Sequence, residues 1–267
     1  MKPAIITLLT DFGTQDYFVG AIKGVILSIN PYARIVDITH DLPSQDIESA
    51  AFNLLSCYRD FPADTIHVAV VDPGVGSERR ALAIECATQI FVGPDNGIFS
   101  WICEREKKYR AFSITAEKLF RQPVSATFHG RDIFVPVAAA LSAGTQIDEL
   151  GEPVKDIVRL APLTPKTLDN RTIEARIIHI DRFGNCTTNL TLDHLREDMF
   201  DRGAKLTINQ HEIIKFCRSF ADANDAKPFC FFGSAGFLEI GVKNSSAQEI
   251  LKAQCGLSIQ FLTPLDS

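Results

Sequence analysis

The sequence predicts an α/β protein with an N-terminal, mostly parallel sheet flanked by helices and a smaller C-terminal antiparallel domain that resembles a β-barrel. Two observations predict this fold class. Up to about residue 160, apolar runs typical of buried strands alternate with amphipathic helical patterns. Beyond residue 171, short stretches alternate apolar and polar residues with a period of two. The segment 161–171 holds two prolines and few large apolar residues, so we expect a linker between domains at 1–160 and 172–267.

The elements of the N-terminal domain follow from the spacing of apolar residues. Residues 4–9 form a continuous apolar run, as expected for a strand buried on both faces. The next pattern is helical, and Asn30-Pro31 ends it. Asp46 is the expected N-cap of the second helix, and Pro136 falls in the first turn of the last, where its missing N–H does no harm. The expected strands are 4–9, 34–38, 65–71, 81–86 and 90–92, and the expected helices are 18–29, 47–58 and 132–142.

The C-terminal domain shows strand patterns and turn signals instead. Apolar side chains at 173, 175 and 177 alternate with polar ones, and the same alternation recurs at 257–261. Phe183-Gly184-Asn185 and Asn209-Gln210 are turn sequences between such segments. We therefore expect an antiparallel arrangement in this part of the chain.

Composition excludes several classes of protein. Lys and Arg total 27 against 33 Asp and Glu, a net charge of −6, which disfavours general binding to nucleic acid. The seven cysteines are odd in number and show no CxxC spacing, which indicates reduced thiols and a cytoplasmic location. The apolar runs are all much shorter than the roughly 20 residues that span a bilayer, so we expect no membrane association.

The candidate chemistry lies where predicted strands end. Asp11 follows the first strand, Asp72 follows the 65–71 strand, and His129 precedes the last helix. Ligands of open α/β sheets bind outside the carboxyl ends of strands, so Asp11 and Asp72 should share one edge. One such aspartate alone is better explained as a turn former, whereas two at strand ends with a histidine before a helix make a functional site equally plausible. A hard metal at Asp11, Asp16, Asp72 and His129 is disfavoured, because no helical histidine pair or close carboxylate pair supports it.

The loop 72–79 has an unusual composition. Gly74 and Gly76 allow a sharp turn and a close backbone approach to a ligand. The loop is not a dinucleotide fingerprint, because no third glycine and no helix follow, and it lacks the Gly-Lys-Ser/Thr of a phosphate-binding loop. A tight turn that exposes Arg79 is the alternative interpretation.

Six ordered segments together resemble the S-adenosyl-L-methionine hydroxide adenosyltransferases, which are relatives of the fluorinase and chlorinase. The segments are LLTDFGTQDYFVGAIKG, VVDPGVGSERR, FVGPDNGIFS, TFHGRDIFVPVAA, IDRFGNCTTN and FGSAGFLEIGV. The resemblance implies an N-terminal α/β domain, a C-terminal barrel-like domain and a homotrimer. It also implies that the ligand lies between the N-domain of one subunit and the C-domain of the next, and that S-adenosylmethionine is a substrate, with no cofactor.

The resemblance assigns water activation to an Asp–Arg–His set, which matches Asp72, Arg79 and His129 here. Halogenases carry tyrosine at the position of Asp72, and the fluorinase has a halide-binding serine at the position of Gly130. The long fluorinase insertion is also absent between Cys86 and Ile90. These three departures favour water over halide as the nucleophile. Ala235 replaces a fluorinase arginine, so the resemblance does not imply how the methionine carboxylate is held.

The resemblance also implies a set of substrate-binding residues. Asp11 matches the ribose-binding aspartate, Asp16 and Asp181 match acidic residues near the methionine part, and Phe220 matches the aromatic residue that stacks on adenine. The complete implied set is Asp11, Asp16, Asp181, Phe183, Asn185, Phe220, Ser234, Glu239, Val242 and Asn244.

The implied reaction is hydrolysis of S-adenosylmethionine, or of its (R)-sulfonium epimer, to adenosine and L-methionine. Water attacks the ribose C5′, either Asp72 or His129 takes the proton, and Arg79 orients the water. Two other functions stay open from the sequence. One is a chloride adenosyltransferase, and the other is a non-catalytic sensor of S-adenosylmethionine or adenosine.

Overall fold

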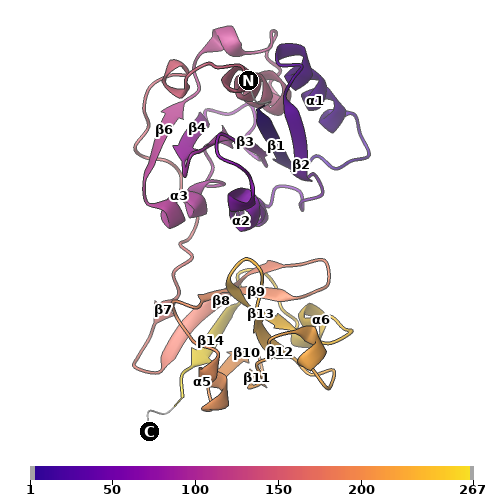
Figure 1. Ribbon diagram of the computed structural model, residues 1–267, viewed down its shortest axis with the longest axis vertical. Helices are drawn as coiled ribbons and strands as arrows, with labels where there is room; N and C mark the ends of the chain where they lie inside the picture. The colour runs from indigo at the N-terminus through magenta and orange to yellow at the C-terminus, as the bar shows by residue number, and fades with distance from the viewer. Residues whose placement is uncertain (1–3, 265–267) are drawn as a thin grey trace. The chain divides into compact units, whose positions relative to one another are not determined.

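The computed structural model describes residues 4–264, and Figure 1 shows the course of the chain. The chain divides into two compact units, Met1–Ala161 and Pro162–Ser267. Each unit has its own sheet and its own hydrophobic core. The N-terminal unit is α/β, and the C-terminal unit is built mainly of antiparallel strands, as the sequence predicts.

The N-terminal unit contains a six-stranded mixed sheet with the order β2-β1-β3-β5-β4-β6. The strands are β1 (Ile5–Thr10), β2 (Arg34–Thr39), β3 (Ile66–Val70), β4 (Ala81–Cys86), β5 (Gln89–Pro94) and β6 (Tyr109–Ser113). The pairs β1–β2, β1–β3 and β3–β5 are parallel, whereas β4 is antiparallel to both β5 and β6. Only Ala87 and Thr88 join β4 to β5, and both have positive φ. A two-residue hairpin connects antiparallel strands, so the sheet is mixed.

Helices cover both faces of this sheet. The helices are α1 (Phe18–Ile29), α2 (Ile47–Cys57), α3 (Ser100–Glu106) and α4 (Val135–Ser142). Helices α1 and α4 pack together against one face, where Ile22 and Ile26 join Ile6, Leu8 and Val68 in the core. Helices α2 and α3 also pack together, with contacts to β1 and β4 respectively. The side chain of Asp46 accepts a hydrogen bond from Ser49 N at 2.9 Å, which confirms the expected N-cap of α2.

The last helix of this unit begins differently from the prediction. A π-helical turn covers Gly130–Phe134, and the α-helix proper starts at Val135 with Pro136 in its first turn. Pro136 has no N–H to donate to the carbonyl of Asp132, and that carbonyl instead accepts from Arg121 N at 2.9 Å. The released carbonyl therefore ties the segment before His129 to the helix start. Short 3-10 turns lie at Tyr58–Asp60, Glu117–Leu119 and Ile147–Glu149.

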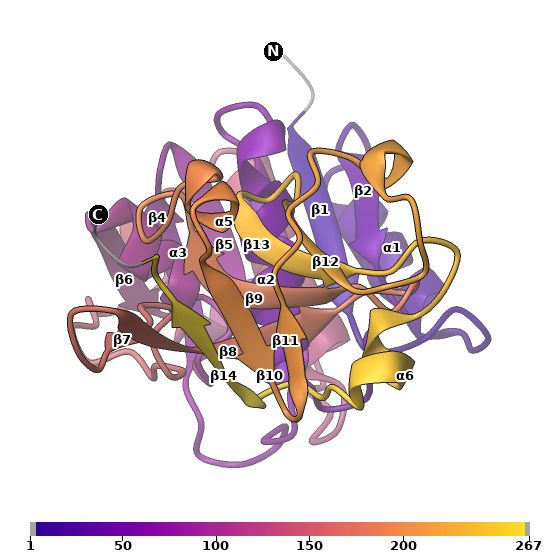
Figure 2. The ribbon, with the colours of Figure 1, turned by 90° about the horizontal axis from the view of Figure 1, so that it is seen from below.

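The C-terminal unit is an eight-stranded antiparallel sheet that nearly closes into a barrel, and Figure 2 shows its strands from below. Its strands are β7 (Lys166–Thr167), β8 (Thr172–Ile180), β9 (Cys186–Thr191), β10 (Lys205–Ile208), β11 (His211–Ile213), β12 (Phe229–Phe232), β13 (Phe237–Gly241) and β14 (Ser258–Leu262). Seven strands follow the order β11-β10-β14-β8-β9-β13-β12, and β7 pairs with β8. A bridge between Phe216, just beyond β11, and Cys230 in β12 joins the two ends of the sheet.

Turns and short helices complete this unit. The turn at residues 183–185 connects β8 to β9, and the turn at 209–210 connects β10 to β11, as predicted. The helical segments are α5 (Asp198–Asp201), the 3-10 turn Phe220–Asp222 and α6 (Ala247–Leu251). The segment 161–171, expected to be a linker, contains β7 and therefore adds a short hairpin to the sheet.

The structure also bears on two sequence-based expectations, the absence of membrane-spanning segments and the reduced state of the cysteines. Among residues 4–264, no helix combines the length and the apolar character needed to cross a membrane. All seven cysteines lie in this range and are free thiols, and only Cys57 and Cys255 are not buried. Burial raises the pKa of the Cys186 thiol, for example, to about 12, which keeps that thiol protonated and unreactive.

Candidate active site

The carboxyl edge of the N-terminal sheet brings the two strand-end aspartates together. Strands β1 and β3 are parallel neighbours, with Thr10 opposite Val70 in the register. Figure 1 shows these strands side by side. Asp11 and Asp72 therefore leave the sheet at the same edge, as the sequence predicts.

A tight, glycine-dependent turn brings Arg79 back to Asp72. Val75 N donates to Asp72 O at 3.2 Å, and Ser77 N donates to Gly74 O at 3.1 Å. Gly76 has φ +78°, and a Cβ at this position would lie 2.4 Å from the carbonyl oxygen of Ala126. Only glycine fits this contact, so the turn is held against the segment that leads to His129.

Asp72, Arg79 and His129 form one hydrogen-bonded cluster. Arg79 Nε donates to Asp72 Oδ1 at 2.9 Å and to Oδ2 at 3.0 Å, and Arg79 Nη2 also donates to Asp72 Oδ2. Arg79 Nη2 lies 2.8 Å from His129 Nδ1. The Arg79 guanidinium also lies over the ring of Phe134, 5.1 Å from its centroid. Because the side chains of Arg79 and Asp72 are only 11% and 6% exposed, bulk water screens this ion pair weakly.

The guanidinium fixes the protonation pattern of His129. A guanidinium nitrogen can only donate, so His129 Nδ1 must accept, and the neutral imidazole carries its proton on Nε2. Burial and the positive charge of Arg79 lower the pKa of His129, although Asp72 and Asp132 oppose this shift. The structure therefore favours a neutral His129 that offers an N–H to its surroundings.

Aromatic contacts connect the Asp11 turn to the His129 segment. The Phe12 ring packs edge-on against Phe128, with centroids 5.7 Å apart. A Cβ at Gly130 would lie 3.1 Å from Phe12 Cζ, so a larger residue there would require Phe12 to move. Phe12 thus contacts both neighbours of His129. Asp11 itself accepts a hydrogen bond from Gln45 N at 2.9 Å, and Asp16 lies exposed just before α1.

Sequence reasoning missed the structural importance of Asp132. Its side chain is fully buried and accepts from Ser125 N at 2.9 Å and from Arg131 Nε at 2.7 Å. These bonds hold the segment that precedes His129. The residue lies in the quoted segment TFHGRDIFVPVAA, but the sequence offers no sign that its carboxylate turns inward.

Five of the predicted substrate-binding residues of the C-terminal unit surround one cavity of about 430 Å³. The lining residues are Phe183, Asn185, Phe220, Val242, Asn244 and Ser245. The Phe220 ring is 40% exposed, and its edges are held by Phe229 and Phe231 at centroid distances of 5.2 and 5.0 Å. A Cβ at Gly241 would lie 2.9 Å from Phe220 Cζ. The absence of a side chain at Gly241 therefore leaves room for the Phe220 ring. The result is a fixed, partly open aromatic face beside polar groups.

One carboxylate bonds to a residue of this cavity, and a second interacts with the first. Asp181 accepts from Asn185 N and Asn185 Nδ2, both at 2.8 Å, and so orients the buried amide that lines the cavity. Burial, reinforced by the negative charge of Asp181, raises the pKa of Glu239 to about 7. The Glu239 carboxylate also lies against Gly233, where a Cβ would be 1.9 Å from Oε1. Ser234 is exposed in the turn that follows.

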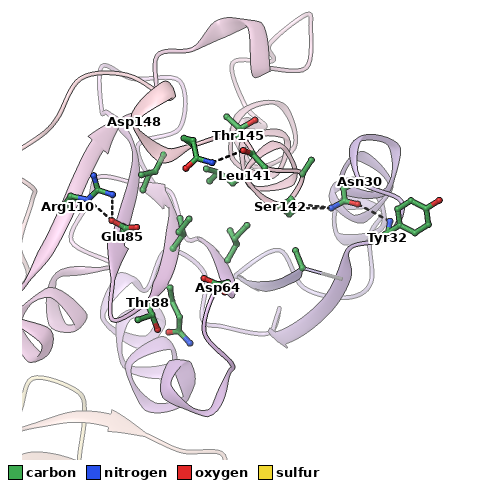
Figure 3. Close-up of a pocket in the computed structure, with 18 residues that line it drawn as sticks. Asn30, Tyr32, Asp64, Glu85, Thr88, Arg110, Leu141, Ser142, Thr145 and Asp148 are labelled. Carbon is green, nitrogen blue, oxygen red and sulfur yellow. Dashed lines mark hydrogen bonds and ion pairs between the residues drawn. The ribbon is translucent and has the colours of Figure 1, made fainter. Parts of the chain in front are cut away.

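A larger cavity, of about 1030 Å³, lies at the opposite, amino edge of the N-terminal sheet and is shown in Figure 3. Its wall contains Ile66 of β3 and Thr88 of the β4–β5 turn. Among the polar side chains labelled there, Arg110 is paired to Glu85 and Asn30 donates to Ser142 (Figure 3). We therefore place the candidate chemistry at the carboxyl edge. Over residues 4–264, no group of three or more His, Cys, Asp or Glu side chains has a metal-binding arrangement.

Fold and site together define a two-unit α/β protein with a carboxylate–guanidinium–imidazole cluster in one unit and a cavity lined partly by aromatic side chains in the other. The chain belongs to the SAM hydroxide adenosyltransferase family. The family model of the N-terminal domain matches residues 6–151, and that of the C-terminal domain matches residues 175–260. This confirms the resemblance that the six segments indicate.

Individual relatives agree with this assignment. The (R)-S-adenosyl-L-methionine hydrolase of Methanocaldococcus jannaschii is 37% identical over 257 residues, covering 92% of this chain and 91% of the relative. A fluorinase of an Actinoplanes species is 27% identical over 286 residues and covers 96% of both chains. The crystal structure of an uncharacterized conserved protein from Thermotoga maritima matches with a TM-score of 0.88 at 33% identity, covering 96% of this chain and 99% of that one.

Proposed function

We propose that this protein hydrolyses S-adenosylmethionine to adenosine and L-methionine, with preference for the (R)-sulfonium epimer named in its hydrolase relative. The observation that carries the proposal is the hydrogen-bonded cluster of Asp72, Arg79 and His129 at the carboxyl edge of the sheet. An aspartate at position 72 would repel a halide, and the space at Gly130 is already taken up by Phe12. Both features favour water over chloride as the nucleophile.

The difficult part of this reaction is the activation of water, which is a poor nucleophile. Its oxygen attacks the ribose C5′ while the C5′–S bond breaks, and the electron pair of that bond goes to sulfur. The cationic sulfonium becomes a neutral thioether, so the leaving group needs no proton. Lowering the pKa of water from 15.7 to about 7 beforehand would require roughly 12 kcal/mol. We therefore propose that the proton leaves while the C–O bond forms, when the attacking oxygen has become strongly acidic.

Asp72 is the better proton acceptor of the two candidates. His129 Nδ1 already accepts from Arg79, and its Nε2 carries a proton in the neutral form, so neither nitrogen offers a lone pair. The oxygens of Asp72 keep further lone pairs beyond those that Arg79 uses. In this proposal Arg79 holds Asp72 and His129 in place and His129 Nε2–H orients the water.

The remaining predicted residues fit the rest of the substrate. Phe220 offers an aromatic face to adenine, and Asn185 offers a buried amide to its edge. Asp11 offers carboxylate oxygens to the ribose hydroxyls. Asp16, Asp181 and Glu239 suit a substrate that carries both a sulfonium and an ammonium group. We propose no metal or cofactor, since the leaving group departs neutral and the proton has an acceptor.

We further propose a homotrimer in which the N-terminal unit of one subunit and the C-terminal unit of another contribute to each site. In support, the Asp72 cluster and the Phe220 cavity belong to different compact units. Two inactive variants, Arg79→Ala and Phe220→Ala, should regain activity when their subunits are mixed by unfolding and refolding. A mixture that stays inactive although it forms trimers would contradict shared sites. A cytoplasmic location is proposed on the seven free thiols.

The test of the activity is a chromatographic assay with each sulfonium epimer, with and without chloride and a metal chelator. We expect adenosine and methionine irrespective of chloride and chelator, and faster turnover of the (R) epimer. Arg79→Ala should reduce kcat by roughly 100-fold or more, whereas Arg110→Ala, which breaks an ion pair at the opposite edge, should not. A 5′-chlorinated nucleoside would identify a halogenase, and adenosine binding without any product would identify a sensor.

A further inference from the structure

A buried chain of polar side chains lies behind the Asp11 turn. His40 follows β2 and is only 4% exposed. Its Nδ1 lies 2.8 Å from Thr10 Oγ1, the last residue of β1, and its Nε2 lies 3.2 Å from Asp37 Oδ1. Asp37 also accepts from Lys23 of α1 at 2.6 Å. The mechanism proposed above uses none of these four residues.

The closeness of Asp37 to Nε2 favours the His40 tautomer that carries its proton on Nε2, which leaves Nδ1 as an acceptor. Thr10 Oγ1 accepts from Phe12 N at 3.2 Å and has one proton to donate, which goes to His40 Nδ1. Nε2 faces the Asp37 carboxylate at 3.2 Å, although without the geometry of a hydrogen bond. The imidazole therefore fixes the Thr10 rotamer that receives the Phe12 N–H.

His40 also holds the turn from the other side. Its backbone carbonyl accepts from Gly13 N at 2.8 Å, and Gly13 has φ +69°. The two residues after Asp11 are thus tied to the same histidine, one through its side chain and Thr10, the other through its main chain. The Asp11 carboxylate accepts from Gln45 N, so its direction depends on how the turn lies against the 40–45 segment.

We propose that His40, acting through Thr10, is a positioning residue that aims the Asp11 carboxylate at the ribose hydroxyls of the substrate. This inference rests on the proposed function, which gives Asp11 its ribose-binding role. Neither His40 nor Thr10 touches the substrate in this proposal. Their effect is that Asp11 and Phe12 are already in place before the substrate binds, which removes an ordering penalty from binding.

The test compares two ligands that differ only in the groups Asp11 would bind. Affinities for adenosine and for 2′,3′-dideoxyadenosine are measured by calorimetry on wild type and on Thr10→Val, Thr10→Ser and His40→Asn. Valine has nearly the shape of threonine but cannot accept from Phe12 N, whereas serine can. Asparagine places an amide oxygen close to the position of Nδ1. Thermal unfolding confirms that each variant is folded.

We expect Thr10→Val to bind adenosine about fivefold more weakly than wild type, on the order of one lost hydrogen bond. Its affinity for the dideoxy ligand should not change, and Thr10→Ser and His40→Asn should recover most of the loss. Equal losses for both ligands would show a general structural role and overturn the inference, as would wild-type affinities throughout.

The Asp11→Asn variant tests the ribose-binding role of Asp11 separately from the positioning role of His40. If Asp11→Asn binds adenosine as tightly as wild type does, the ribose-binding role of Asp11 is refuted, and the inference about His40 is refuted with it. If Asp11→Asn shows the loss and Thr10→Val does not, only the role of His40 is refuted.

Discussion

Glu239 should make the stability of the ligand-free protein fall as pH rises, and Glu239→Gln should remove this effect. Burial first, and the charge of Asp181 second, raise the pKa of Glu239 from 4.5 to about 7 in the folded state. Between these two values the folded state binds more protons than the unfolded state, because the unfolded glutamate has already ionised. The free energy of unfolding therefore decreases as pH rises from 4.5 through 7.

The magnitude follows from the size of the pKa change. The rise in pKa from 4.5 to about 7 corresponds to at most roughly 3–4 kcal/mol. The side chain is partly solvated, so screening reduces this to roughly 1–2 kcal/mol. Relative to wild type, Glu239→Gln should gain that amount by pH 8 and almost nothing at pH 4.5. The gain corresponds to a rise in Tm of roughly 3–6 °C.

The assay is thermal and urea unfolding of both proteins at half-unit steps from pH 4.5 to 8.5. Glu117→Gln, at an exposed position of the other unit, is the matched control and should follow wild type at every pH. Asp181→Asn should shrink the effect without abolishing it, because burial is the larger cause. A difference between Glu239→Gln and wild type that stays constant with pH would refute the reasoning.

Three further outcomes are expected. In Gly76→Ala the new Cβ would meet the Ala126 carbonyl oxygen at 2.4 Å. This variant should lower the free energy of unfolding in urea by roughly 2 kcal/mol and reduce turnover. The control Gly24→Ala, which has open space around its Cβ, should do neither. Phe220→Leu should weaken adenosine binding about tenfold by calorimetry through loss of stacking, and an unchanged affinity would place adenine elsewhere. In Arg79→Gln the NMR-detected pKa of His129 should rise, since a positive charge that lowers it is gone; a lower value would contradict the assigned cause.

Local patterns were sufficient to predict most of the fold. The apolar run that became β1 and the 3.6-residue spacing that became α1 are properties of neighbouring residues, so the sequence displays them directly. The Asp46 cap is equally local. The antiparallel β4–β5 hairpin was not predicted, because Ala87 and Thr88 are unusual residues for positive φ and give no turn signal.

The site was predictable only in part. Asp11 and Asp72 stand at strand ends, so their shared edge followed from the topology rules of α/β sheets. His129 was a candidate because it precedes the last helix of the unit. Arg79 and the residues of the Phe220 cavity entered through the resemblance of six segments, and the structure places five of those cavity residues around one space. The inward turn of the Asp132 carboxylate and the chain from His40 to Thr10 had no signal in the sequence.

The sequence by itself predicted most elements of the N-terminal unit, though not α3 or β6, together with the two kinds of sheet and the candidate residues at the strand ends. Only the tertiary structure decided which atoms meet. Arg79 reaches His129 Nδ1 because the Gly76 turn lies against Ala126, fifty residues along the chain. A donor that cannot accept thereby fixes the histidine tautomer, and this contact underlies our proposal that Asp72 accepts the proton. Such contacts depend on distances of a few tenths of an ångström between remote segments, and spacing along a sequence does not encode them.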